Sequence, residues 1–113
     1  MQTQINLEEM QDRLYERKKV LVKQIEIESL KVLPSDNAGT DRADLAYDYE
    51  YRAHRVALLN RLEEQIEEID RALKRIEDGT YGICSNCGEA IMPERLKALP
   101  YAEFCIKCQR KEH

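Results

Sequence analysis

Four cysteines are the residues of this chain best suited to chemistry. Cys84 and Cys87 are separated by two residues, seventeen residues follow, and Cys105 and Cys108 repeat the first spacing. Each Cys-x-x-Cys pair brings two sulfur atoms to one side of a tight turn. Two such pairs that face each other form a tetrahedral S₄ site, with metal–sulfur distances near ~2.3 Å for zinc. The spacing therefore predicts one zinc ion; iron in a rubredoxin-like site and a thiol redox pair are the alternatives.

The predicted zinc site is structural. Gly82 and Gly88 flank the first pair and permit positive φ, which lets backbone N–H groups point at the thiolates. Four cysteines close the coordination shell, whereas a catalytic zinc keeps one position open. Neither His54 nor His113 has ligand-like spacing. We find no nucleophile–base pair, open metal site or phosphate loop, so we do not expect an enzyme.

The composition favours long helices over a large globular core. The chain has 113 residues, of which 35% are charged and 6% aromatic, with no Trp. A net charge of -4 disfavours binding to nucleic acid by charge alone. The chain start does not resemble a signal peptide, and no apolar stretch approaches the ~20 residues of a membrane span. We expect a cytoplasmic protein, where thiols stay reduced and bind metal rather than form disulfides.

Two helices are predicted before the cysteines. The first spans 6–33, where Asn6 is a candidate cap and Pro34 ends the helix. The segment 34–40 is rich in turn residues. The second helix spans 41–78, would be roughly 55 Å long, and stops at Gly79. The apolar seam residues at helical spacing are Leu7, Met10, Leu14, Leu21, Ile25 and Val32, then Leu45, Tyr49, Val56, Leu59, Leu62, Ile66, Ile69, Leu73 and Ile76.

Neither helix can bury its apolar seam alone, and the segment between them is short. These features predict an all-α fold in which residues 1–78 form a long antiparallel coiled-coil hairpin with its tip at about 34–46. Residues 79–113 would form a small zinc-finger domain. The loop length favours pairing within one chain, and so a monomer; pairing between two chains is the alternative.

The predicted tip is acidic. Asp41 and Asp44 are three residues apart and share a face in the first turn of the second helix. One explanation is helix capping, because acidic residues there offset the helix dipole by ~0.3–1 kcal/mol each. The other is that an acidic tip at the end of a long rod reaches into a channel and meets basic residues or a magnesium site. Composition leaves both open.

The C-terminal part of the chain closely resembles the zinc-finger signature of the DksA/TraR family. The resemblance lies in residues 72–109, ALKRIEDGTYGICSNCGEAIMPERLKALPYAEFCIKCQ. It rests on the R-I-E-x-G-T-Y-G lead-in, C-x-x-C-G, I-x-x-x-R-L-x-A-x-P and the final C-x-x-C-Q. At the tip, Asp41, Asp44 and Ala46 match a D-x-x-D-x-A pattern of DksA-type members. With the two helices included, the resemblance covers most of residues 6–110.

The resemblance implies a transcription regulator. Members of the family bind bacterial RNA polymerase and not DNA, insert the hairpin into the secondary channel, and alter the stability of promoter open complexes. By similarity, Asp41 and Asp44 are effector residues and Ala46 offers a small contact surface. The family fold also implies a globular zinc-bearing end with a short helix after Cys105.

The chain departs from the family pattern in two places. It lacks most of the N-terminal segment that pads the globular end in DksA. Where members that respond to the alarmone guanosine tetraphosphate (ppGpp) carry basic residues, our alignment places Glu68, Leu99 and Gln109. None of these side chains is cationic, so none can pair with phosphates. We expect weak or absent alarmone dependence, as in TraR-like members.

Two other functions compete with polymerase regulation. A zinc-finger module for nucleic acid or another protein would need a basic or aromatic surface near the zinc. From Cys84 to His113 five basic residues oppose four acidic ones, which disfavours a phosphate-tracking face and sequence-specific DNA binding. A thiol-based stress sensor that releases zinc on oxidation is the other alternative, and it is compatible with polymerase binding.

Overall fold

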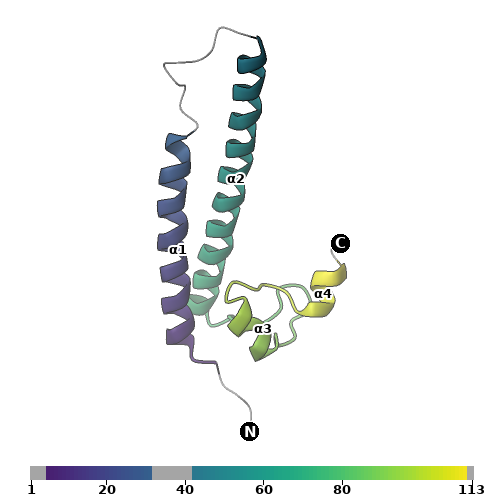
Figure 1. The fold of residues 1–113 in the computed structure, drawn as a ribbon. Coiled ribbons are helices and arrows are strands. Elements are labelled where there is room, and N and C mark those ends of the chain that lie inside the picture. Colours follow the sequence, from purple (N-terminus) through teal and green to yellow (C-terminus); the bar gives the residue numbers. More distant parts are fainter. Residues whose placement is uncertain (1–4, 32–41, 112–113) are drawn as a thin grey trace. The chain divides into compact units, whose positions relative to one another are not determined.

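The computed structural model describes the backbone of residues 5–31 and 42–111 and the side chains of 5–31 and 49–110. Over these residues the fold is helical, with α1 at Leu7–Leu30, α2 at Arg42–Asp78, α3 at Pro93–Ala98 and α4 at Ile106–Lys111 (Figure 1). In the described part of the chain, the β-structure is one isolated antiparallel bridge, Ile83 to Ala90. No helix among these is long and apolar enough to cross a membrane.

Contacts divide the chain into two compact units. The discontinuous unit combines Met1–Lys18 with Glu67–His113, and the continuous unit is Lys19–Ile66. Both long helices contribute a segment to each unit. The predicted division into a coiled-coil hairpin at 1–78 and a zinc-finger domain at 79–113 is a different partition, and it stays a prediction.

The start of α1 follows the sequence prediction. The backbone N–H of Glu9 donates to Oδ1 of Asn6 at 3.1 Å, and the N–H of Met10 donates to the Asn6 carbonyl at 3.0 Å. Asn6 therefore caps the helix, because it satisfies an N–H that has no partner inside the first turn. The helix ends at Leu30, before the predicted residue 33, and residues 32–41, including Pro34, lie outside the described residues.

The end of α2 is set by a glycine, as predicted. Gly79 has φ +80, a value that an L side chain rarely adopts. The N–H of Gly79 donates to the Ile76 carbonyl at 3.3 Å, and the N–H of Thr80 donates to the Arg75 carbonyl at 2.9 Å. This pair of bonds is a Schellman motif, which satisfies helix carbonyls that would otherwise lack partners.

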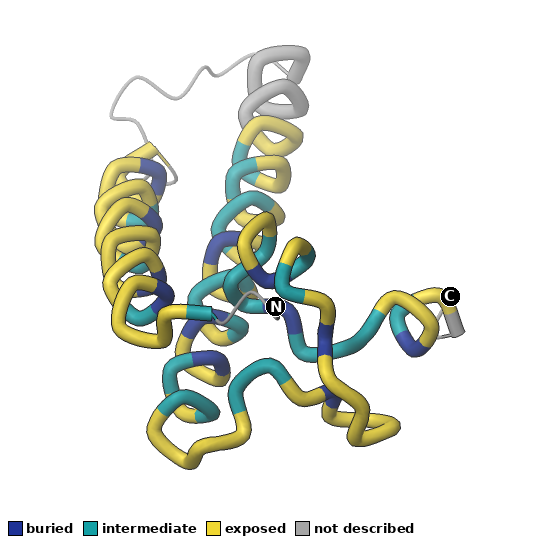
Figure 2. Tube along the Cα trace, turned by 90° about the horizontal axis from the view of Figure 1, so that it is seen from below, coloured by how far each residue is buried: buried dark blue, intermediate teal, exposed yellow. Residues whose placement is uncertain are grey.

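Each unit pairs a segment of α1 with a segment of α2. In the discontinuous unit, Met10 and Leu14 of α1 are buried, as are Ile69 and Ala72 of α2. The Nζ of Lys18 lies 2.8 Å from Oδ1 of Asp70 across the two helices. The buried positions recur along one side of each helix (Figure 2). The predicted amphipathic pairing thus explains why these helices form.

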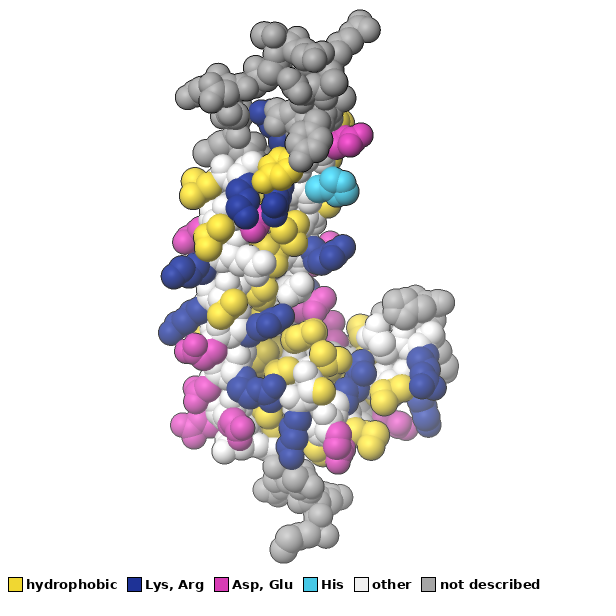
Figure 3. All heavy atoms as spheres, in the orientation of Figure 1, with side chains coloured by type: hydrophobic (Ala, Val, Ile, Leu, Met, Phe, Trp, Pro, Cys, Tyr) yellow, Lys and Arg dark blue, Asp and Glu magenta, His cyan; other side chains and the backbone are white. Residues whose placement is uncertain are grey.

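Part of the predicted seam is solvent-exposed. Leu7 and Val56 are exposed, and Tyr49 is 76% exposed. Conversely, the continuous unit buries Leu21 and Leu62 together with a carboxylate, Glu28. On the face drawn in Figure 3, basic and acidic side chains are interspersed, so the described surface there carries no field of a single sign.

Candidate metal centre

The first pair of cysteines is held by a short hairpin. The N–H of Ile91 donates to the Gly82 carbonyl at 2.7 Å, and the N–H of Cys84 donates to the Glu89 carbonyl at 2.8 Å. Gly82 and Gly88 have φ +83 and +79, which confirms the predicted need for glycine at both positions. The hairpin folds the chain back on itself so that both cysteines lie on one turn.

The second pair lies at the start of α4. The N–H of Gln109 donates to the Cys105 carbonyl at 2.9 Å, so Cys105 precedes the helix and Cys108 lies in its first turn. This short helix after Cys105 was predicted from the family resemblance. The Nδ2 of Asn86, from the first hairpin, donates to Sγ of Cys108 at 3.4 Å. A side-chain donor to a ligand sulfur is typical of the groups that orient metal ligands.

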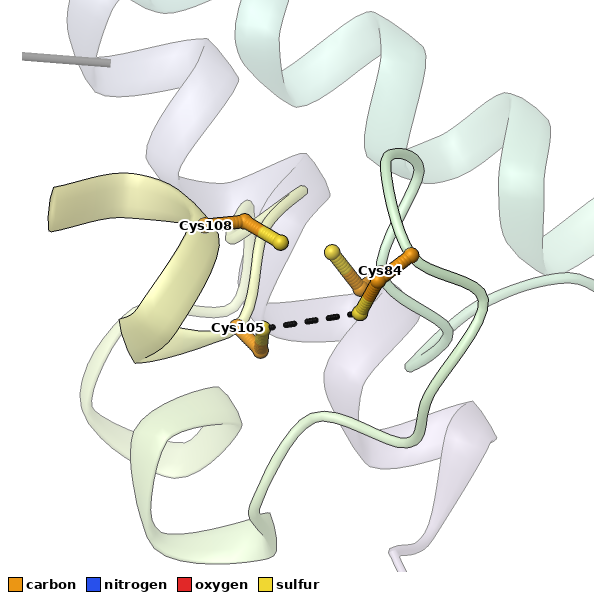
Figure 4. A group of neighbouring side chains, drawn as sticks. Cys84, Cys105 and Cys108 are labelled. Carbon is orange, nitrogen blue, oxygen red and sulfur yellow. Dashed lines mark hydrogen bonds between the residues drawn. The ribbon is translucent and has the colours of Figure 1, made fainter. Parts of the chain in front are cut away.

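The four sulfur atoms form a cluster of the size that zinc requires. The Sγ atoms of Cys84, Cys87, Cys105 and Cys108 all lie within 4.8 Å of one another, and the sulfurs of Cys87 and Cys105 are 3.7 Å apart. In a tetrahedron with Zn–S near ~2.3 Å, sulfurs are about 3.8 Å apart. None of the four cysteines is in a disulfide. Figure 4 shows the Cys84, Cys105 and Cys108 sulfurs turned toward one another. The geometry fits one tetrahedral ion.

The thiol pKa values show why a cation belongs in this cluster. Burial raises the pKa of Cys84, but backbone N–H donors, the strongest from Cys87, outweigh it and lower that pKa to about 6. The N–H of Glu89 lowers the pKa of Cys87, but desolvation and the neighbouring sulfurs, including that of Cys105, raise it to about 12. One thiol therefore ionises readily while another stays protonated. A divalent cation allows four thiolates to coexist, with release of their protons.

A small apolar core supports the cluster. Cys84 and Cys108 are themselves buried in it, and the other buried residues are Ile91, Leu96 and Ala102. Partly buried side chains pack against this core, namely Ile5, Tyr81, Leu99, Phe104 and Cys105. A core of this size is too small to hold the segment folded without the metal. This is the basis for assigning the site a structural role.

The segment between the two cysteine pairs is tied to α2 through Glu103. Its Oε1 accepts from Arg71 Nε at 2.8 Å and from Arg75 Nη1 at 2.9 Å, and Arg75 Nη2 donates to the Ala102 carbonyl at 3.2 Å. The Glu103 carbonyl accepts from the Ser85 N–H at 2.9 Å. Burial lowers the pKa of Arg75, although the Glu103 carboxylate opposes this shift. Glu103 thus links α2, the first hairpin and the second cysteine pair.

The three positions aligned with alarmone-binding residues lie around one pocket. Glu68, Leu99 and Gln109 line a pocket of about 490 Å³ within the discontinuous unit. The two basic residues in its lining are Arg71 and Arg95. The Nε of Arg71 is bonded to Glu103, and the Nε of Arg95 donates to the Phe104 carbonyl at 3.1 Å. The three positions were selected by sequence alignment alone, and in the structure they line the same pocket.

The tip prediction is not tested by these geometries. Asp41 lies outside the described residues. Asp44 and Ala46 belong to the helical backbone of α2, but their side chains lie outside the described set. Their role as effector residues stays a prediction.

Comparison with known proteins also indicates a zinc site formed by four cysteines. The profile of the prokaryotic dksA/traR C4-type zinc finger matches residues 79–112. An RNA polymerase-binding transcription factor DksA of Caulobacter vibrioides is 39% identical over 71 residues, which are 63% of this chain and 50% of that protein. Two other curated relatives are matched over 30% and 28% of their length. The chain thus spans half or less of these curated relatives.

Two solved structures have the same fold. Transcription factor DksA2 from Pseudomonas aeruginosa superposes with a TM-score of 0.80 at 33% identity, over 94% of this chain and 81% of that one. DnaK suppressor protein from Agrobacterium tumefaciens C58 superposes with a TM-score of 0.64 at 29% identity, over 96% of both chains. These similarities confirm the predicted fold class of paired helices with a zinc-bearing end.

A pair of long helices joined to a C4 zinc site defines a class of helical zinc-finger proteins. The chain belongs to the DksA/TraR family within that class. The family confirms the predicted cofactor, one zinc ion held by the four cysteines. The relatives from Caulobacter vibrioides and Pseudomonas aeruginosa are named as transcription factors, which agrees with the expectation that the chain is not an enzyme.

Proposed function

We propose that this chain is a transcription regulator that binds bacterial RNA polymerase. In this proposal the α1–α2 pair enters the secondary channel, and Asp41 and Asp44, with Ala46 beside them, act near the active centre on the stability of open complexes. The zinc end is a structural base and does not read DNA sequence. The protein acts as a monomer in the cytoplasm, where the polymerase is found.

The similarity to DksA2 over 94% of the chain carries this proposal, because it includes both long helices and the metal centre. A zinc-finger match alone would support many binding modules. The distinguishing feature of this chain is the combination of a four-cysteine cluster with a 37-residue helix. The interspersed surface charges in Figure 3 favour a protein partner over the phosphate backbone of nucleic acid.

A competition experiment tests the proposal. The zinc-loaded protein is titrated against core RNA polymerase from its own host, with and without a known secondary-channel factor. We expect mutually exclusive binding at micromolar concentration or tighter. An Asp41→Asn/Asp44→Asn variant should bind with similar affinity and lose its effect on open-complex lifetime, since the proposal gives these carboxylates a regulatory role. Simultaneous binding of both factors would exclude the secondary channel, and absence of binding would exclude the polymerase as partner.

The exposure of Cys87 favours one second candidate function, a thiol-based sensor that also acts on polymerase. One hydrogen peroxide would take two electrons from the Cys87 and Cys105 thiolates, form their disulfide, and leave as two waters after taking up two protons. Loss of two ligands would release the zinc. Zinc release measured with a chromogenic chelator should reach one ion per peroxide reduced. Retention of zinc after the peroxide is consumed would contradict this function.

A further inference from the structure

Where its side chains are described, the seam between α1 and α2 contains one charged layer. On α1, Leu14, Leu21 and Glu28 are spaced seven residues apart, and all three are buried. On α2, Leu62 and Ile69 are buried at the same spacing, and the position seven residues before Leu62 is Arg55. A seven-residue repeat marks one position of a coiled-coil seam. Glu28 and Arg55 therefore occupy seam positions that elsewhere on each helix carry aliphatic residues.

Glu28 is well compensated for its burial. It is 8% exposed, and among the described residues it is the buried side chain that carries charge. Arg55 Nη1 lies 2.5 Å from its Oε2, and Lys31 Nζ lies 3.3 Å from its Oε1, so both oxygens have a cationic partner. The Arg55 guanidinium also lies over the Tyr51 ring, 5.0 Å from the centroid. The Glu28 carboxylate and the Tyr51 ring thus fix the orientation of Arg55.

The contact defines a register for the continuous unit. Because the helices run in opposite directions, the pairing of Glu28 with Arg55 places Leu21 level with Leu62. A slip of one heptad, about 10 Å, would place Glu28 level with Leu62 in one direction. In the other direction it would place Glu28 level with position 48, which is an aspartate in the sequence. The first slip leaves a buried carboxylate without its Arg55 partner, and the second opposes two carboxylates.

We propose that the Glu28–Arg55 pair determines the register of α1 against α2 in the continuous unit. Aliphatic layers alone tolerate a heptad slip, because one aliphatic side chain then faces another, as Leu21 would face Ile69. A single polar layer excludes the slipped states, at some cost in stability. The two helices lead from this layer into the segment that carries Asp41 and Asp44. The pair is therefore a positioning element for these tip residues, a consequence that rests on the proposed function.

Nuclear magnetic resonance on the full zinc-loaded chain tests the register directly. The variant Glu28→Leu/Arg55→Leu should be at least as thermally stable as the wild type, because it replaces an ion pair with apolar packing. It should nevertheless show two sets of amide resonances for residues 19–31. The population of the slipped register should increase at least about tenfold and so become detectable. The wild type should show one set and a methyl contact between Leu21 and Leu62.

Two further variants control the result. The charge swap Glu28→Arg/Lys31→Glu/Arg55→Glu should restore a single set of resonances in the wild-type register. The matched control Lys18→Leu/Asp70→Leu removes an exposed pair, with side chains 37% and 49% exposed, and should keep one set. One wild-type set in the double-leucine variant would overturn the proposal. If that variant does not fold, the charge swap decides: one native set supports the pair, and doubling or unfolding overturns it.

A polymerase assay separates this inference from the proposed function. With the register relaxed, the double-leucine variant should keep its affinity for polymerase and lose about tenfold of its effect on open-complex lifetime, since a misplacement of ~1 Å can cost up to ~10²-fold. The charge swap should recover that effect. An unchanged effect in the double-leucine variant would overturn the positioning role. Failure of the wild type to bind polymerase would refute the proposed function, and the resonance measurements would still decide the register.

Discussion

Replacement of Glu103 by glutamine should lower the local stability of the zinc centre, although Glu103 is not a metal ligand. The Glu103 carboxylate is the shared acceptor for Arg71 and Arg75, and no metal ligand is altered by the change. The side chain of Arg75 is 12% exposed, and its Nε has no hydrogen-bond partner among the described residues. Glutamine keeps the shape and one acceptor, so the substitution removes mainly the negative charge. A largely buried guanidinium is then left without its counter-ion.

The magnitude follows from burial. Breaking a fully buried ion pair by loss of one partner costs ~3–5 kcal/mol, and exposed pairs contribute ~0–1 kcal/mol. The Glu103 side chain is 23% exposed, so the pair lies between these limits. We expect a loss of about 2 kcal/mol in local stability. At ~1.4 kcal/mol per factor of ten, this corresponds to roughly thirtyfold faster opening.

Hydrogen–deuterium exchange of the zinc-loaded protein measures this opening. The amide of Ser85 reports directly, because it donates to the Glu103 carbonyl. Arg71→Gln is the matched control: that side chain is 50% exposed, and its loss should accelerate exchange by less than about fivefold. The double variant Glu103→Gln/Arg75→Met should exchange more slowly than Glu103→Gln alone, because it leaves no buried unpaired charge.

Two results would refute this reasoning. If Glu103→Gln and Arg71→Gln accelerate the Ser85 amide equally, burial of Arg75 does not set the cost. If Arg75→Met added to Glu103→Gln makes exchange faster still, the two residues contribute independently. In either case Glu103 would be one surface acceptor among others.

Three further predictions concern the metal centre and its surroundings. Chelation of the zinc should remove exchange protection from residues 79–111 and leave most of the far-ultraviolet circular dichroism of α1 and α2, because the local core is too small to persist alone; an unchanged exchange pattern after proven zinc loss would contradict a structural role. Gly82→Ala should lower the midpoint of thermal unfolding more than Gly88→Ala does. Both substitutions strain a residue with positive φ by about 1 kcal/mol. Of the two, only the Cβ added at Gly82 meets a side chain, Leu96 Cδ1 at 3.3 Å. Guanosine tetraphosphate should change the protein's effect on transcription little, because the pocket has no cationic side chain at Glu68, Leu99 or Gln109. The substitution Glu68→Lys should make that effect depend on guanosine tetraphosphate. A strong response of the wild type would count against the alignment.

The four ligands of the metal centre could be predicted from sequence, whereas the Asn86 donor to Cys108 could not. Four ligands of one type at paired spacing have few geometric solutions, and the glycines beside Cys84 and Cys87 must adopt the φ values that they do. Helix ends at Asn6 and Gly79 were predictable for a similar reason. Caps depend on a few neighbouring residues, and tertiary packing seldom overrides them.

The polar layer of the seam could not be predicted in this way. Amphipathic analysis assigns charged residues to the solvent side, so Glu28 and Arg55 were not considered core positions. Arg55 reaches the Glu28 carboxylate only through the pairing of the two helices. This ion pair is what makes the burial of Glu28 tolerable. The same analysis assigned Tyr49 and Val56 to the seam, although both are exposed. Helix α3 was also missed, and Pro93 followed by Glu94 at its first positions was the available signal.

The discontinuous unit has a consequence for how the protein is made. The continuous unit, Lys19–Ile66, is complete as soon as residue 66 has left the ribosome. The discontinuous unit joins Met1–Lys18 to a segment that contains the last zinc ligand, Cys108, ninety residues after Lys18. The first stretch of α1 must therefore wait for its partners until almost all of this sequence has been translated. All four ligands can hold a zinc ion together only after Cys108 has been synthesised, so the complete metal centre forms later than the continuous unit.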